Sequence, residues 1–216
     1  SGATDAVRRA FASGFDPATP DVDGRTVHQI AKDLGHAAIE ILARDTQGGI
    51  IRPAAEADIV QRMLRAAQSG DVAGLRAVLD AHPHLIDALG GGFQKATALH
   101  LAALRNQHAT ARLLIARGAD PDSRDFPDNA TPLQFAAAHA DVAMVRLLAE
   151  GGADVNYGAD DYEVGVLGWA TCFGNVREDV AAYLIGRGAR LNLWTAIALD
   201  REDDVRSMIA GDRALL

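Results

Sequence analysis

Apolar and polar residues follow the same order in two stretches of the chain that lie roughly 34 residues apart. Thr97–Gln107 reads TALHLAALRNQ, and Thr131–Asp141 reads TPLQFAAAHAD. A third, weaker copy begins at Gly165, and apolar residues recur at helical spacing over residues 142–148. The pattern predicts a short helix, a tight turn and a longer amphipathic helix in each copy. Such a helix pair buries its apolar face only when it stacks on neighbouring pairs.

Residues with particular backbone preferences mark the ends of these predicted helices. Thr97 and Thr131 stand where an N-cap side chain is needed, and Pro132 takes the first helical position. Asn106 stands in the turn between two helices, where it tolerates the left-handed conformation. Just past each second helix comes a glycine, which forms a left-handed cap with little strain; these glycines are Gly118, Gly152 and Gly188.

The repeated segments TALHLAA, TPLQFAA, GADPD and GADVN resemble the ankyrin repeat family, whose units of about 33 residues carry a T-P-L-H-x-A core. The resemblance implies a mainly α fold: an ankyrin-repeat solenoid of stacked helix-turn-helix units joined by short β-hairpin loops. It also implies that His100, in the TALH motif, hydrogen-bonds to the backbone of neighbouring loops.

The period divides the chain into two blocks. Residues 1–45 form an N-terminal ankyrin-like block with one partial and one degenerate repeat, and 46–57 form an interrupting loop or linker that contains Gly-Gly and Pro. Residues 58–216 form the array. Its units are a helix pair at 58–89, repeats at 90–122, 123–156 and 157–192, and a partial unit at 193–216. Because this last unit stops soon after its second helix, we expect an excerpt from a longer protein.

The composition of the chain indicates what kind of core it has and which classes of binding partner are excluded. Apolar residues make up 49 % of the chain but aromatic residues only 5 %, so the core is built from short side chains that suit close helix stacking. The formal net charge of −8 argues against a nucleic-acid partner, whose phosphates need Lys and Arg. No apolar run is long enough to span a membrane. The single cysteine, Cys172, fits a reducing compartment, and we expect a cytoplasmic protein.

Two groups of side chains are candidates for a catalytic site and for a metal site. Cys172 and His139 fall at adjacent positions of successive repeats, and a base near a thiol increases its thiolate fraction. Neither an orienting group nor an oxyanion site accompanies them, so we expect no catalysis. His82 and His84 offer two imidazoles where zinc needs three or four ligands, and Pro83 between them is expected to end a helix begun near Val72. We expect no metal and no cofactor.

The family's variable positions, carried over residue by residue, give a candidate binding surface of hairpin tips and first-helix faces. Asp160, Asp161 and Glu163 beside Tyr157 and Tyr162 would form an acidic-aromatic patch suited to a segment carrying Lys or Arg. The alternative is that Phe126 and Tyr162 fold back to plug irregular hairpins. The predicted partner-binding residues are Phe93, Gln94, Leu104, Arg105, Phe126, Asp128, Asn129, His139, Tyr157, Asp160, Asp161, Tyr162, Glu163, Cys172 and Phe173.

The sequence supports three hypotheses about function. We expect a non-catalytic protein-protein interaction module that binds a protein or peptide partner with a basic segment through this concave surface. We expect it to bind neither nucleic acid nor a membrane. The rival is an accessory or regulatory segment of a larger enzyme or scaffold, with Cys172 and His139 in its groove. The third is an array that only spaces the other domains of a longer chain.

Overall fold

The structure is a computed structural model that describes residues 54–90, 95–125, 128–157, 164–172 and 176–211. The N-terminal block predicted at 1–45 lies outside the described residues. The elements in chain order are α4 (Ala54–Ser69), α5 (Val72–Ala81), the 3-10 turn η1 (Pro83–Leu85), α6 (Ala98–Leu104), α7 (His108–Ala116), α8 (Pro132–His139), α9 (Val142–Glu150), α10 (Gly165–Thr171), α11 (Glu178–Gly186), α12 (Leu193–Ala198) and α13 (Glu202–Gly211).

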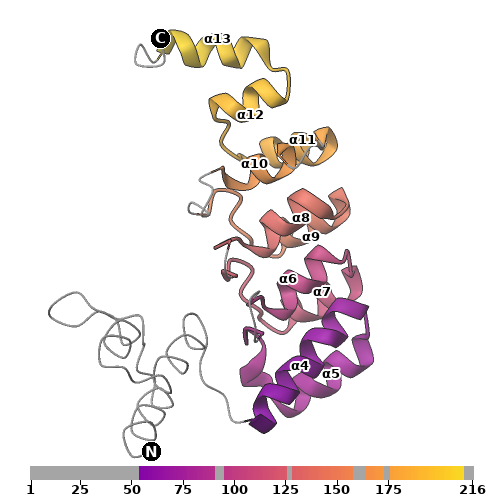
Figure 1. The fold of residues 1–216 in the computed structure, drawn as a ribbon. Helices are drawn as coiled ribbons and strands as arrows, with labels where there is room; N and C mark the ends of the chain where they lie inside the picture. Colours follow the sequence, from indigo (N-terminus) through magenta and orange to yellow (C-terminus); the bar gives the residue numbers. More distant parts are fainter. Residues whose placement is uncertain (1–53, 91–94, 126–127, 158–163, 173–175, 212–216) are drawn as a thin grey trace, which may run out of the picture.

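The helices stack as pairs in a single column, with α4 and α5 at one end and α13 at the other (Figure 1). The first helices α6, α8, α10 and α12 contact one another in order. The second helices α5, α7, α9 and α11 do the same and form what we call the second-helix layer. None of the described residues belongs to a strand; the loops are instead closed by single backbone hydrogen bonds, from Gly90 to Ala96 and from Asp125 to Ala130, each 3.0 Å long. The predicted helical solenoid is therefore confirmed.

The predicted caps of α6 and α8 are confirmed. The Thr97 and Thr131 hydroxyls accept from the backbone N–H of the third helical residue, and the side chains of His100 and Gln134 accept in return from the N-cap N–H groups. The helix α12 closes in the same manner with Asn192 at its N-cap.

The helix α10 begins differently, because Gly165 stands where the other repeats have threonine. Its N-cap is Val164, whose side chain makes no capping hydrogen bond. A Cβ atom added at Gly168 would lie 2.3 Å from the Val164 Cβ, so glycine is required there. The Val164 side chain thus lies beside the position that carries the His100 or Gln134 side chain in the other repeats.

Left-handed residues end the units as the sequence predicts. Gly118, Gly152 and Gly188 have φ angles of 85°, 105° and 90°, and Asn106 has a φ of 56° in the turn between α6 and α7. At the three glycines this conformation turns the chain, after each second helix, back toward the loop edge, which is the side of the array where the loops between units lie.

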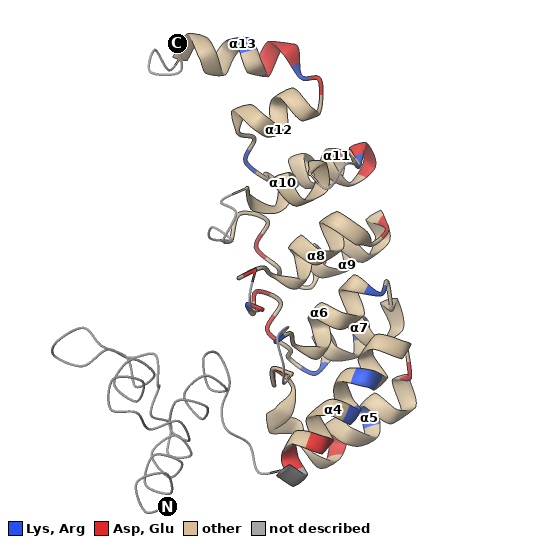
Figure 2. Cartoon of the chain, in the orientation of Figure 1, with Lys and Arg blue, Asp and Glu red and all other residues tan. Residues whose placement is uncertain are grey.

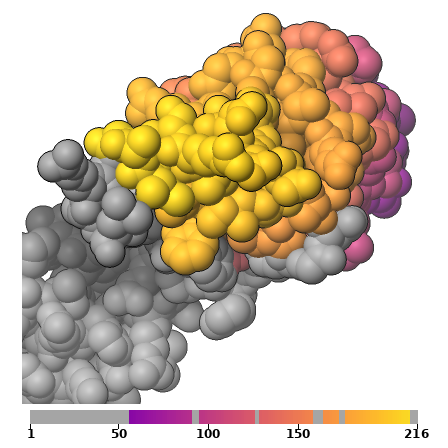
Figure 3. Space-filling view, turned by 90° about the horizontal axis from the view of Figure 1, so that it is seen from above, coloured from indigo at the N-terminus to yellow at the C-terminus, as the bar shows by residue number. Residues whose placement is uncertain are grey.

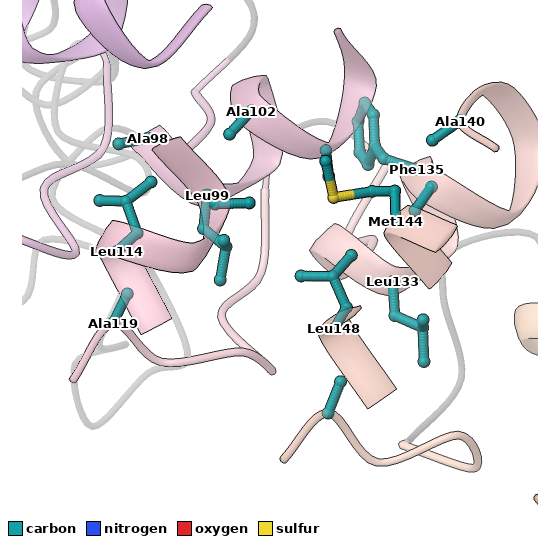
Figure 4. Packing of buried hydrophobic residues seen from close by; sticks show 14 of the residues in the cluster. Ala98, Leu99, Ala102, Leu114, Ala119, Leu133, Phe135, Ala140, Met144 and Leu148 are labelled. Atoms are coloured by element: carbon teal, nitrogen blue, oxygen red, sulfur yellow. The ribbon is translucent and has the colours of Figure 1, made fainter. Parts of the chain in front are cut away.

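A continuous apolar core fills the space between the two helix layers (Figure 4). Leu99, Leu114 and Leu133 are almost fully buried in it. Alanine at contact positions such as Ala102 and Ala136 lets the helix backbones approach closely. The Phe135 ring lies between two repeats, 5.5 Å from the ring of His100 and 5.6 Å from that of Trp169.

A ladder of side-chain to backbone hydrogen bonds joins the loops of successive units. In each rung a side-chain oxygen accepts from the backbone N–H that follows the Gly-Ala ending of the next unit. The bonds run from Asp120 N to Asp87 Oδ1, from Asp154 N to Asp122 Oδ1 and from Arg190 N to Asn156 Oδ1, and each is 2.9 to 3.0 Å long. The ladder fixes the spacing of the loop edge independently of the core.

The N-terminal end of the described array departs from the expected pattern. The helix α4 begins at Ala54, inside the segment 46–57 that was expected to interrupt the array. The reason is composition, since residues 54–57 are Ala, Ala, Glu and Ala, all strong helix formers. At the other end, seen in Figure 3, α13 contains no buried residue and Trp194 of α12 is 77 % exposed. None of the described helices is long and apolar enough to cross a membrane.

Candidate partner-binding surface

The structure describes about half of the predicted binding residues. Leu104, Arg105, Asp128, Asn129, His139, Tyr157 and Cys172 are described. Phe93, Gln94, Phe126, Asp160, Asp161, Tyr162, Glu163 and Phe173 lie outside the described residues, and so does the question of whether Phe126 and Tyr162 plug the hairpins. The described residues fall into two groups, one at the carboxyl ends of the first helices and one on the loops.

The first group follows the carboxyl ends of three consecutive first helices. Arg105 is the C-cap of α6, His139 is the last residue of α8, and Cys172 is the C-cap of α10. All three are exposed, whereas Leu104 is half-buried. Because the helices stack in register, these side chains form one row along the array, which we call the helix-end row.

Arg177, which the sequence patterns did not single out, joins this row from the N-cap of α11. Its guanidinium donates to the carbonyl oxygens of Ala136 and Ala137, at 3.4 and 3.3 Å, in the last turn of α8. A cation at this end of a helix stabilises unpaired carbonyl groups. Partial burial and the nearby Arg177 charge both lower the pKa of His139.

This arrangement weighs against a Cys172–His139 nucleophile. A general base must become an imidazolium when it takes the thiol proton, and the positive charge of Arg177 disfavours that form of His139. Cys172 itself is a free, exposed thiol. The helix-end row is therefore better suited to contact than to proton transfer.

The second group lies on the loop edge. Tyr157 is 43 % exposed, and the Arg124 guanidinium carbon lies 4.8 Å from its ring centroid. Arg124 also donates to the Asn129 carbonyl oxygen, and Asn129 adopts a positive φ of 52°. Arg124, from the loop between α7 and α8, thus connects its own loop to the loop between α9 and α10. Figure 2 shows acidic residues along this edge with basic positions among them.

A hollow of about 240 Å³ opens on the same edge, between the N-terminal ends of α8, α10 and α12. Its lining includes Gln134, Tyr157, Gly165, Arg190 and Asn192. Glycine at position 165 leaves space that the threonine of the other repeats would occupy. Opposite charges, from Asp154 and Arg190, lie in its lining, so the hollow can receive a polar or a charged side chain.

The histidines of the HPH sequence lie apart from this surface. As predicted, α5 ends before Pro83, which begins the turn η1. His84 Nε2 lies 3.2 Å from Glu56 Oε1, and the His82 and His84 ring centroids are 6.1 Å apart. Within the described part of the chain, no group of three or more His, Cys, Asp and Glu side chains is placed to hold a metal ion.

Comparison with known proteins relates the chain to parts of larger proteins. It is 29 % identical over 143 residues to a transient receptor potential cation channel subfamily A member 1 homolog of Caenorhabditis elegans, which covers 65 % of this chain and 10 % of that protein. It is 33 % identical over 97 residues to a putative ankyrin repeat protein of Fowlpox virus, covering 44 % of this chain and 21 % of the viral protein.

A third relative, the glycerophosphocholine phosphodiesterase gde1 of Schizosaccharomyces pombe, is 34 % identical over 88 residues, or 41 % of this chain and 7 % of that protein. The chain therefore spans at most about a fifth of the length of these relatives. The family model described as ankyrin repeats in three copies matches residues 63–159 and 99–195. Ankyrin repeats are a non-catalytic fold and generally serve as protein-protein interaction modules. With more than half of its residues matched and its helix pairs stacked in register, the chain belongs to the ankyrin repeat family.

Proposed function

We propose that the chain binds a protein or peptide partner along the concave surface formed by the loop edge and the helix-end row. The observation that carries this proposal is the alignment of exposed, chemically varied side chains at equivalent or adjacent positions of successive units, with Arg105, His139 and Cys172 on the helices and Tyr157 on the loops. Loop and edge residues on a rigid scaffold are where proteins concentrate binding.

The scaffold behind this surface supports the proposal, because it holds the row without help from the exposed residues. The core leucines, the capping boxes and the loop ladder account for the stacking of the units. An interface that is already ordered loses less conformational entropy when its partner binds.

Charge suggests how a partner would lie on the surface. Arg105 and Arg177 make one side of it basic, and we propose that Asp160, Asp161 and Glu163 make the loop side acidic. A basic segment of the partner would then lie over the loop side, with Tyr157 as an aromatic anchor. We place this binding in the cytoplasm, because a single cysteine fits a reducing compartment.

A second candidate is an accessory or regulatory segment within a larger enzyme or scaffold. The observation in its favour is that the relatives include a protein named as a phosphodiesterase and one named as a channel, and the chain matches only a small part of each. In that case the partner is another domain of the same polypeptide.

The proposal is tested by capturing partners with the full chain from extracts of its source cells and then footprinting the complex. Cys172 is the only cysteine in the sequence, so its alkylation rate reports one position of the helix-end row. We expect a saturating partner to slow alkylation of Cys172. The control is the double variant Cys172→Ser and Arg76→Cys, which places the thiol on the second-helix layer and should stay fully reactive.

Two variants test the loop and helix sides of the same surface. Tyr157→Ala with Arg105→Glu, and Tyr162→Ala with Asp161→Lys, are each expected to weaken the captured complex about tenfold or more. If both double variants retained full affinity and the partner protected Arg76→Cys instead of Cys172, the concave surface would not be the binding site.

A further inference from the structure

The second-helix layer contains an irregularity that the family pattern does not explain. At the first interface between units, Arg117 Nη1 lies 2.7 Å from Asp80 Oδ1, so an ion pair joins the end of α7 to α5. The residues at the same distances from the N-caps in the following units are Ala116 in place of Asp80 and Gly151 in place of Arg117. Both members of the ion pair are therefore replaced by small residues at the α7–α9 interface.

A groove of about 360 Å³ lies where this pair is missing, and its lining includes both Ala116 and Gly151. The largest apolar side chains in its lining are those of Ile115 and Leu147. A Cβ atom added at Gly151 would lie 2.9 Å from Ile115 Cδ1, so the isoleucine already packs against the glycine backbone. We call this hollow between α7 and α9 the outer groove, because it lies on the second-helix layer and not on the first-helix layer that carries the helix-end row.

Two guanidinium groups also line the outer groove. Arg112 of α7 is exposed, and its side chain makes neither a hydrogen bond nor an ion pair with the described residues. Arg146 of α9 stacks over the Tyr183 ring of α11, with its guanidinium carbon 4.7 Å from the ring centroid. Stacking uses the face of the guanidinium and leaves its N–H edge suited to an anion.

The net charge of the groove is opposite to that of the whole protein. Arg112 and Arg146 carry two positive charges, Glu150 is the one carboxylate in the lining, and the chain as a whole has a formal charge of −8. A groove lined by apolar side chains and two cations fits a segment that carries both an apolar side chain and carboxylates. A basic segment, as proposed for the concave surface, would meet two like charges here.

We propose that the outer groove binds an acidic peptide segment of a partner protein, seating an apolar side chain over Ile115 and Leu147 and pairing its carboxylates with Arg112 and Arg146. This site is separate from the concave surface, so the two can be occupied by different segments. The charges of the site select an acidic segment, and the space left by Ala116 and Gly151 accommodates the apolar side chain that anchors it.

The test uses short fluorescein-labelled peptides with a central leucine, phenylalanine or tryptophan between glutamates, and matched peptides with lysines in their place. Binding to the full chain is measured by fluorescence anisotropy at low and at high salt. We expect at least one glutamate peptide to bind more tightly than its lysine counterpart, and its affinity to fall as salt screens the charges. Binding by no glutamate peptide at concentrations up to about 1 mM would overturn the proposal.

Three variants locate the bound peptide. Arg112→Glu is expected to weaken binding of the glutamate peptide about tenfold. Arg76→Glu makes the same change at the equivalent position of α5, outside the outer groove, and should change binding less than about twofold. Gly151→Arg restores the residue that the neighbouring units carry and fills the groove, so it should also weaken binding about tenfold.

Circular dichroism and thermal unfolding of each variant establish that the array is folded before binding is compared. Equal losses in Arg112→Glu and Arg76→Glu, or full affinity in a folded Gly151→Arg protein, would each overturn the assignment of the outer groove. Neither result bears on the concave surface, whose test rests on Cys172 and Tyr157.

Discussion

The imidazole of His100 connects its own helix cap to the carbonyl group of Ala130 in the next loop. Nε2 lies 3.0 Å from the Ala130 oxygen, and Nδ1 lies 2.8 Å from Thr97 Oγ1 and 3.3 Å from Thr97 N. Because a carbonyl oxygen only accepts and a backbone N–H only donates, the ring is neutral with its proton on Nε2. Burial lowers the pKa of His100 from 6.5 to about 4.

This contact predicts that the protein loses stability in mild acid. The pKa of His100 is lower in the folded state than in the unfolded state. The stability that neutral His100 contributes to the fold is therefore fully present above about pH 6.5 and is lost as the pH falls toward 4. A shift of this size corresponds to a loss on the order of 3 kcal/mol in the free energy of unfolding. Urea unfolding followed by circular dichroism across this pH range measures it.

The chain supplies its own control for this measurement. Gln134 occupies the equivalent position of the next repeat and completes the capping box there without titrating. The substitution His100→Gln is therefore expected to keep the Thr97 cap and to flatten the slope of stability against pH between 6.5 and 4. An unchanged slope in His100→Gln would assign the acid sensitivity to other groups.

Asp122 gives a prediction of the opposite sign. Burial first, and then the neighbouring Asp120 and Asp154 carboxylates, raise its pKa above the usual 3.8. The folded state therefore holds this proton more tightly than the unfolded state, and the free energy of unfolding falls as the pH rises through the raised pKa. At neutral pH the ionised side chain is consequently a source of instability.

Asp122→Asn is expected to raise the free energy of unfolding at pH 7 by roughly a few tenths of a kcal/mol, a value discounted for solvent screening. Asparagine keeps an acceptor for Asp154 N, as Asn156 already does for Arg190 N at 2.9 Å. Asp122→Ala removes the acceptor and should cost about 1 kcal/mol. The gain from asparagine should shrink in high salt; a destabilised Asp122→Asn protein would contradict the proposed repulsion.

The two tryptophans offer a third prediction. Trp169 is 4 % exposed, whereas Trp194 is 77 % exposed, and the sequence contains no other tryptophan. In Trp169→Phe the remaining emission should be that of an indole in water, red-shifted and readily quenched by acrylamide. In Trp194→Phe it should be blue-shifted and protected. Similar quenching in both variants would show that α12 lies in a different register.

Local signals in the sequence predicted much of this fold because each acts over a few residues. Thr97 and Thr131 are capping residues within one turn of their partners, and Gly118 ends its unit through its own backbone. The side chains that meet across units were harder to predict. Arg177 follows a turn with extra residues, which shifts its register against His139, and nothing in its local sequence indicates that it contacts α8.

The candidate site was predicted unevenly for the same reason. Repeat spacing places Arg105 and His139 at equivalent positions and Cys172 at the adjacent one, so the row could be predicted from the sequence. The stacking of Arg124 on Tyr157 depends on the conformation of two loops, which repeat spacing alone does not specify. The sequence does contain a signal of the outer groove, because glycine stands at position 151 where the equivalent residues 117 and 187 are arginine. This signal could be interpreted only once the structure showed the Asp80–Arg117 ion pair.

The ladder of Asp87, Asp122 and Asn156 has a consequence for how such a chain changes length during evolution. Every rung uses the same pair of groups, a side-chain oxygen and the N–H after the next Gly-Ala. Recombination that removes or duplicates residues 123–156 would leave a matched donor and acceptor at the new junction. The gene can therefore gain or lose whole repeats and keep this hydrogen bond at the junction. An insertion of a few residues would separate the donor from its acceptor.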